Sequence, residues 1–199
     1  MYSAILFDLD GTHADSVTGI EWSAHRALGE VLPAAPLQSL RPFIGPTMDV
    51  IFANYLQSHA PSQHAAMTEQ IWRNLIASYR RTYDGEGCLR CTAFPNASEV
   101  LKALQSAGVR CVVVTNKPKL PTARVLRALA LTAHFEALVS PDSRSPIYRD
   151  KSEMVEDVLR QHGLSAGEVL LVGDGRDEVV DPGRLDDGFR HQAFTRAAV

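Results

Sequence analysis

The chain has 199 residues, of which 45% are hydrophobic and 22% are charged, and its formal net charge at pH 7 is −3. This composition is typical of a globular protein with one full core and a small second unit, and the negative charge argues against binding nucleic acid by neutralising phosphates. No apolar run could span a bilayer, no signal peptide is visible, and three cysteines are too few for a disulfide framework. We therefore expect a cytoplasmic protein without a membrane or nucleic-acid partner, and its oligomeric state is left open.

The first predicted element is a buried strand that ends in two carboxylates. Residues 4–7 are apolar, and Asp8, Leu9, Asp10 and Gly11 follow them directly. A short apolar run that stops at a turn signal is typical of a strand in a parallel sheet. Because side chains alternate along a strand, both carboxylates should project to one side of its carboxyl end, where α/β sheets bind ligands. A divalent cation or a shared proton would relieve their repulsion; an exposed acidic turn is the alternative.

Residues 16–90 have the pattern of a helical unit. Apolar residues recur three or four positions apart within residues 17–31, 48–56 and 67–79, which predicts amphipathic helices. A single crossover helix needs far fewer residues than separate the first predicted strand from the second. We therefore expect a helical cap domain at 16–90, inserted after the first strand of a core domain made of residues 1–15 and 91–199.

From residue 91 onward, apolar runs alternate with amphipathic helices. Strands are predicted at residues 109–114, 135–139 and 168–172. Asn96 with Glu99 resembles a capping box at the start of a helix that precedes the strand at 109–114. This alternation predicts βαβ units and hence an α/β fold: a Rossmann-like parallel sheet with helices on both faces. After Asp174 the pattern is lost, and only a weak apolar run follows near the end.

Polar side chains follow three of these predicted strands. Asp8 and Asp10 follow the first, Thr115 and Asn116 follow the next, and Asp174 follows the last. The carboxyl ends of parallel strands lie along one edge of a sheet, so these groups should gather there. Carboxylates suit Mg²⁺, and a hydroxyl with an amide suits phosphate oxygens.

Lys151 stands at a predicted helix start between Asp150 and Glu153. The positive end of the helix dipole disfavours a cation there, so an anion facing Lys151 would explain its presence. The alternative is an exposed lysine paired with Glu153.

Taken in order, these motifs resemble those of the haloacid dehalogenase superfamily. They are residues 8–12 followed by Asp15 and Ser16, residues 115–117, Lys151, and residues 173–174. The closer likeness is to the phosphoglycolate-phosphatase-like subgroup, which carries a helical cap after the first strand. The resemblance covers residues from about 3 to 178.

The resemblance implies roles for the carboxylate pair. Asp8 would be the nucleophile that forms an aspartyl-phosphate. Asp10 would protonate the leaving oxygen and then deprotonate the hydrolytic water. An acid at position 10 favours phosphate chemistry, since the dehalogenase branch lacks one there.

The resemblance also implies how substrate and metal are held. Residues 41–45 resemble the cap segment of the subgroup, so Arg41 would recognise the anion of the substrate. Residues at four positions would bind substrate: Thr115, Asn116, Lys151 and Arg41. Mg²⁺ would be the cofactor, with ligands at Asp8, the Asp10 carbonyl, Asp174 and Glu178.

The sequence departs from the family pattern at three places. His13 occupies a usually apolar position, and we interpret it as a tolerated variant and not a ligand. Gly175 stands where a serine or threonine is usual, and Glu178 where aspartate is commoner. The residues after 178 also lack the usual helix and final strand.

These features predict a Mg²⁺-dependent phosphoric monoester hydrolase that acts on a small phosphorylated metabolite, with phosphoglycolate as the leading candidate. A nucleotidase, a pyrophosphatase or a sugar phosphomutase of the same family is the alternative enzyme. A degenerate member that only binds a phosphorylated ligand or a partner protein is the alternative from another class, and the unusual residues 175–199 support it.

Overall fold

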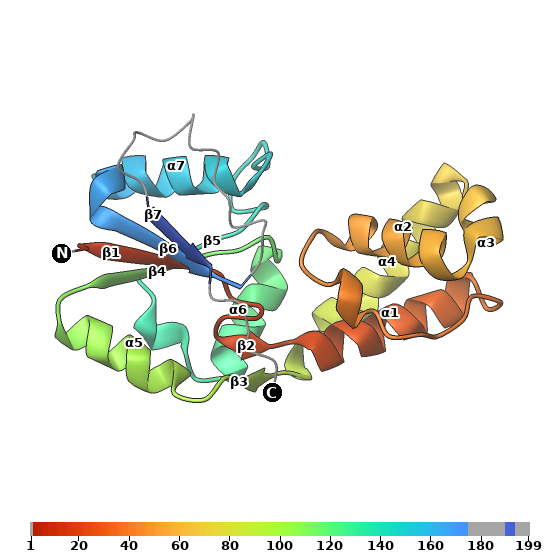
Figure 1. Ribbon diagram of the computed structural model, residues 1–199, viewed down its shortest axis with the longest axis horizontal. Coiled ribbons are helices and arrows are strands. Elements are labelled where there is room, and N and C mark those ends of the chain that lie inside the picture. Colours follow the sequence, from red (N-terminus) through yellow and green to blue (C-terminus); the bar gives the residue numbers. More distant parts are fainter. Residues whose placement is uncertain (1, 175–189, 194–199) are drawn as a thin grey trace. The chain divides into compact units, whose positions relative to one another are not determined.

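The computed structural model describes residues 2–174 and 190–193. The chain divides into two compact units, one formed by Met1–Asp15 together with Thr92–Val199 and the other by Ser16–Cys91 (Figure 1). The first contains a parallel β-sheet, and the second is built from helices.

Five strands form the parallel sheet of the described residues, in the order β5-β4-β1-β6-β7. The strands are β1 (Ala4–Phe7), β4 (Arg110–Val114), β5 (Ala137–Val139), β6 (Val169–Gly173) and β7 (Arg190–Ala193). Strand β1 is central, and Leu6 lies in register with Val112 of β4 and Leu171 of β6. The α/β class and the parallel sheet predicted from the sequence are confirmed.

Helices cover both faces of this sheet (Figure 1). Helix α7 (Lys151–His162) lies on one face, and α5 (Ala97–Ser106) and α6 (Lys119–Ala128) lie on the other. Buried side chains of α7 pack against alternate residues of the central strands, because alternate residues of a strand share one face of the sheet. This cluster includes Ala4, Leu6, Val112, Val114, Met154, Val155, Val158, Leu159, Val169 and Leu171.

Three local features of this unit differ from the sequence interpretation. A two-stranded antiparallel sheet, formed by β2 (Ala14–Asp15) and β3 (Thr92–Ala93), was not predicted because two residues are too few for a periodic pattern. Strand β7 pairs with β6 in the region where no strand was expected apart from the weak run. Asn96 adopts a left-handed conformation and its side chain makes no capping bond to α5, so the expected capping box there is wrong.

The second unit, all of whose residues are described, contains helices and no strand. Its elements are α1 (Val17–Val31), η1 (Arg41–Phe43), α2 (Met48–His59), α3 (Pro61–Ala65), α4 (Glu69–Gly85) and η2 (Gly87–Leu89). Tyr55 of α2 is fully buried, and its hydroxyl donates to the Pro36 carbonyl at 2.5 Å and accepts from the Gln38 N–H at 2.7 Å. These bonds fix the segment that precedes η1. None of the helices in the described residues is both long and apolar enough to cross a membrane.

Candidate active site

Asp8 and Asp10 stand where β1 ends and a tight turn begins. The Asp8 N–H donates to the Val172 carbonyl at 2.9 Å, which continues the β1–β6 ladder by one residue. Leu9 is fully buried, and its carbonyl accepts the N–H groups of the three residues at 12, 13 and 14. Gly11 has φ of +79°, a conformation that glycine adopts at low cost. The turn therefore presents both carboxylates at the carboxyl end of the central strand.

Asp8 is paired with Lys151. The ammonium Nζ lies 3.3 Å from Oδ1 of Asp8, and the lysine side chain is 6% exposed. Lys151 is the first residue of α7, and α7 covers the sheet face to which Leu6 points. Asp8 comes two residues after Leu6, so its side chain projects to the same face. The alternative of an exposed lysine paired with Glu153 is therefore wrong.

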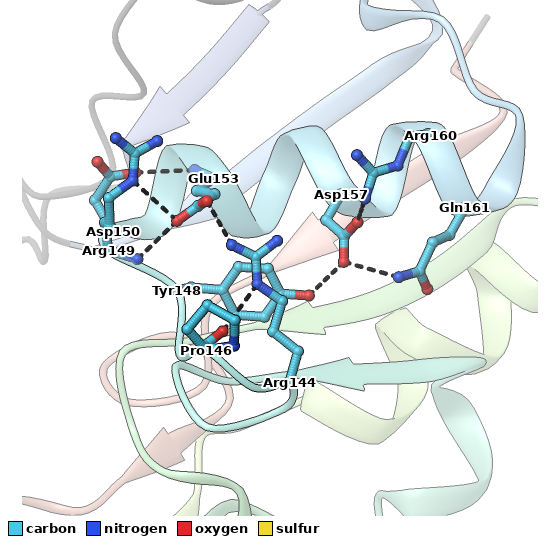
Figure 2. A network of polar contacts seen from close by, with 9 residues as sticks. All are labelled: Arg144, Pro146, Tyr148, Arg149, Asp150, Glu153, Asp157, Arg160 and Gln161. Carbon is cyan, nitrogen blue, oxygen red and sulfur yellow. Dashed lines mark hydrogen bonds and ion pairs between the residues drawn. The ribbon is translucent and has the colours of Figure 1, made fainter.

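Glu153 instead holds the loop that leads into α7 (Figure 2). It forms ion pairs with Arg144 and, at 3.3 Å, with Arg149, and it accepts the Arg149 N–H at 2.8 Å. The Arg149 N–H, together with the two guanidinium groups, lowers the pKa of Glu153 to about 2. Next to Arg149, the Asp150 side chain caps α7 by accepting the Glu153 N–H at 2.9 Å. Lys151 is thus fixed at the helix start by bonds on both sides of it.

Tyr148 completes this network on the buried side (Figure 2). Its hydroxyl donates to Asp157, and the Arg144 guanidinium lies 4.1 Å from the centre of its ring. Burial, followed by the Asp157 carboxylate, raises the pKa of Tyr148 to about 12. Asp157 also accepts a bond from Gln161 at 2.7 Å, so the loop is joined to the second turn of α7 as well as the first.

Asp10 is paired with a second lysine, Lys117, to which the sequence analysis assigned no role. Nζ of Lys117 lies 2.5 Å from Oδ1 of Asp10; the side chains are 4% and 26% exposed, respectively. Lys117 belongs to the loop between β4 and α6, and nothing in its local sequence marks it as buried. The proximity of Asp10 and Lys117 arises only because β1 and β4 are neighbours in the sheet.

The other predicted phosphate ligands follow β4. Thr115 is 1% exposed, its N–H donates to the Val139 carbonyl at 3.1 Å, and its hydroxyl oxygen accepts the Lys117 N–H at 3.3 Å. Asn116 is half-buried beside it. Thr115 and Asn116 therefore lie at the same edge of the sheet as Asp8.

Asp174 follows β6 and approaches the turn at Gly11. A Cβ added at Gly11 would lie only 1.8 Å from Oδ2 of Asp174, so the carboxylate occupies space that any other residue at position 11 would fill. Although Asp174 keeps an exposed surface, desolvation raises its pKa, and the charges of Asp8 and Asp10 raise it further against the opposing effect of Lys151. The edge thus carries more negative charge than its two lysines offset.

Two predicted site residues lie either in the other unit or outside the described residues. Arg41 begins η1 of the helical unit, where its side chain is exposed and its N–H donates to the Glu21 carboxylate at 3.3 Å. Glu178 lies outside the described residues. Their predicted roles therefore remain predictions.

A cavity of about 260 Å³ adjoins the edge. Its lining includes Phe7, Gly11, His13, Val172 and Asp174. Its described lining includes neither Asp8 nor Asp10 and neither of their lysines, so it lies beside these pairs and does not contain them.

The sequence model of the family of haloacid dehalogenase-like hydrolases matches residues 5–180 of this chain. This range includes every motif residue described above. The chain belongs to this family.

Relatives of this haloacid dehalogenase-like hydrolase include phosphoglycolate phosphatases. That of Pseudomonas syringae pv. tomato is 30% identical over 176 residues, which cover 88% of this chain and 63% of the relative. That of Mannheimia succiniciproducens is 28% identical over 180 residues, covering 90% and 80%. The chain therefore spans less than two thirds of the Pseudomonas relative and four fifths of the Mannheimia one.

Solved structures of other proteins share the fold. A Haemophilus somnus protein described as a predicted phosphoglycolate phosphatase has a TM-score of 0.80 at 24% identity, covering 95% of this chain and 87% of that one. A haloacid dehalogenase-like protein of Streptococcus pneumoniae has a TM-score of 0.79 at 22% identity, covering 96% and 84%. At these identities the likeness establishes the fold alone.

The donor set of this haloacid dehalogenase-like hydrolase fits a hard divalent cation. Asp8 and Asp174 supply carboxylate oxygens, and the charges of Asp8 and Asp10 add to the desolvation that raises the pKa of Asp174. Within residues 2–174 and 190–193, no three His, Cys, Asp or Glu side chains are grouped to hold a metal. The expected set needs only two such side chains there, because Asp10 would bind through its carbonyl and Glu178 lies outside this part.

His13 packs inside the turn as an aromatic residue. Its ring centre lies 4.7 Å from that of Phe7 and 5.5 Å from that of Phe135, in edge-to-face arrangements. Its Nε2 is buried and finds no hydrogen-bond partner in the described part of the chain. Burial lowers the pKa of His13 to about 4. His13 therefore fills an aromatic, buried environment as a neutral imidazole.

We expect His13 to make the fold sensitive to mild acid. The folded protein keeps His13 neutral down to about pH 4, whereas the unfolded chain binds a proton below about pH 6.5. The free energy of unfolding should therefore decrease as the pH is lowered from about 7 to 4. This decrease should be up to about 3 kcal/mol larger in the wild type than in His13→Leu. Urea unfolding between pH 4 and 8 measures the difference, which should be constant above pH 7. Parallel curves for the two proteins throughout would contradict this.

Proposed function

We propose that this protein is a Mg²⁺-dependent phosphatase that hydrolyses a small phosphate monoester of the phosphoglycolate type. The observation that carries the proposal is the pairing of Asp8 with buried Lys151 at the carboxyl end of the central strand. The phosphoglycolate phosphatases among the relatives suggest the substrate class.

The chemistry would proceed in two steps. A carboxylate oxygen of Asp8 attacks phosphorus, the bond to the ester oxygen breaks, and Asp10 gives that oxygen its proton. Asp10 then takes a proton from a water molecule that attacks the phosphorus of the aspartyl-phosphate, which releases phosphate and restores Asp8. Lys151 would neutralise the charge shared by Asp8 and the phosphoryl oxygens, while Thr115 and Asn116 hold those oxygens.

Mg²⁺ held by Asp8, the Asp10 carbonyl, Asp174 and Glu178 would supply the positive charge that lets one anion approach another.

The helical unit would act as a cap that selects the substrate and excludes water. In this role Arg41 would recognise the second anionic group of the substrate. Its exposed guanidinium, on a segment anchored by Glu21 and Tyr55, is consistent with such a function.

We expect a screen of phosphate release from a few dozen phosphomonoesters to show activity that needs Mg²⁺ on the order of millimolar. Asp174→Ala should lower kcat/KM by about 100-fold or more and weaken Mg²⁺ binding measured by calorimetry, because it removes a carboxylate ligand. Glu178→Gln should mainly weaken Mg²⁺ binding. The exposed Glu99 provides a matched control, since Glu99→Gln changes a carboxylate on α5 and should affect neither quantity.

The screen also separates the alternatives. Preference for nucleotides or pyrophosphate, or isomerisation of a sugar phosphate, would assign the site to another activity of the family. If no ester is hydrolysed and calorimetry detects no Mg²⁺ binding even with a phosphate mimic present, the non-catalytic alternative holds.

A further inference from the structure

The two carboxylates that follow β1 each have their own lysine, and the lysines come from different elements. Lys151 of α7 lies 3.3 Å from Asp8, and Lys117 of the β4–α6 loop lies 2.5 Å from Asp10. The Lys117 side chain is 4% exposed. A lysine ammonium is strongly hydrated, so it is rarely buried this deeply without a specific partner.

The backbone of Lys117 is fixed on both sides. Its N–H donates to the Thr115 hydroxyl at 3.3 Å, and its carbonyl accepts from the Thr122 hydroxyl at 3.2 Å. Thr122 is fully buried in α6, and its hydroxyl also lies 2.8 Å from the Pro118 carbonyl. The ammonium therefore extends from a fixed point of the sheet edge, which reduces the entropy lost in holding a long side chain.

Asp10 needs such a partner more than Asp8 does. The Asp10 backbone is held through its bridge to Ala14, but its side chain is 26% exposed, twice the 13% of Asp8. A partly exposed carboxylate can turn toward water, and a general acid that turns away cannot reach the leaving oxygen.

We propose that Lys117 is a positioning residue that holds the carboxyl group of Asp10 in the orientation needed to reach the leaving oxygen. This inference rests on the proposed phosphatase function. Lys117 acts through Asp10 and takes no part in bond making, in contrast to Lys151, which faces the nucleophile. The consequence is a dependence on the leaving group, because an alkoxide needs a proton when it departs and p-nitrophenolate does not.

Comparison of two esters tests this inference. In Lys117→Met, kcat/KM for glycerol phosphate should fall by about 100-fold, whereas kcat/KM for p-nitrophenyl phosphate should fall by less than about 5-fold. Asp10→Asn should show the same preferential loss, and Lys117→Arg should recover part of it. Lys119→Met changes an exposed lysine two residues away and should leave both values unchanged.

A second variant keeps the test decisive if Lys117→Met does not fold. Thr122→Val removes a hydrogen bond that fixes the Lys117 backbone. Its kcat/KM should fall less than that of Lys117→Met, but again more for glycerol phosphate than for p-nitrophenyl phosphate. Equal losses on both esters in these variants, with an active wild type, would overturn the inference and leave the proposed function standing. A wild type that releases phosphate from none of the screened esters, these two included, would overturn the proposed function, and the role of Lys117 with it.

Discussion

Replacing Asp8 by asparagine should abolish phosphate release while the protein remains folded. Asparagine has the shape of aspartate and keeps the N–H bond to Val172, but its neutral amide cannot attack phosphorus. We expect kcat/KM to fall by a factor on the order of 10⁴ or more. A fluoride-based mimic of the phosphoryl group, added with Mg²⁺, should bind the wild type tightly and Asp8→Asn weakly, which gives a readout independent of turnover.

The control for this prediction is a carboxylate away from the edge. Glu99→Gln makes the same chemical change on the exposed face of α5 and should keep wild-type activity. Circular dichroism and urea unfolding check that both variants fold. Substantial turnover by a folded Asp8→Asn protein would show that Asp8 is not the nucleophile.

Gly11→Ala should also lower activity strongly, although it adds only one carbon atom. The new Cβ would lie 1.8 Å from Oδ2 and 2.1 Å from Cγ of Asp174, so this carboxylate must move out of its place. The backbone strain at φ of +79° costs a further 1–2 kcal/mol or so in stability. We expect kcat/KM to fall by about 100-fold or more, and Mg²⁺ binding to weaken, because the displaced carboxylate is the proposed metal ligand.

Gly108→Ala is the control that separates the effect of backbone strain from the effect of the contact with Asp174. Gly108 has a similar φ of +75°, but a Cβ added there meets nothing within 4 Å. Gly108→Ala should therefore lose a similar amount of stability in urea unfolding and keep both its activity and its Mg²⁺ affinity. If the two alanine variants were equally active, the contact between position 11 and Asp174 would not matter for function.

Much of the fold could be predicted because its strands are unbroken apolar runs and its helices show a helical period in the sequence. The apolar run before Asp8 and the run before Asp174 are buried strands, and the α7 pattern from Lys151 onward is a helix. The position of Lys151 could also be interpreted physically. The helix dipole disfavours a cation at a helix start unless an anion lies nearby, and in the structure this anion is Asp8.

What could not be predicted depends on contacts between distant segments. The Asp10–Lys117 pair joins residues 107 positions apart, and no local pattern shows that Lys117 is buried. Strand β7 is defined by its pairing with β6, and its own residues have no alternating pattern. Asn96 was misinterpreted because a capping box and a left-handed turn both favour asparagine, and sequence alone does not distinguish them.

The position of β1 bears on the order in which this chain folds. It precedes the other described strands of the sheet in sequence, yet its two neighbours begin only at Arg110 and Val169. Contacts this distant in sequence are slow to form, because a long loop must close first. The helical segment between Ser16 and Cys91 relies on contacts within itself, and the residues flanking it pair directly, Ala14 with Ala93. Once this segment has collapsed, the loop between β1 and β4 is effectively short, so the inserted helices remove much of the kinetic cost that their length would otherwise impose.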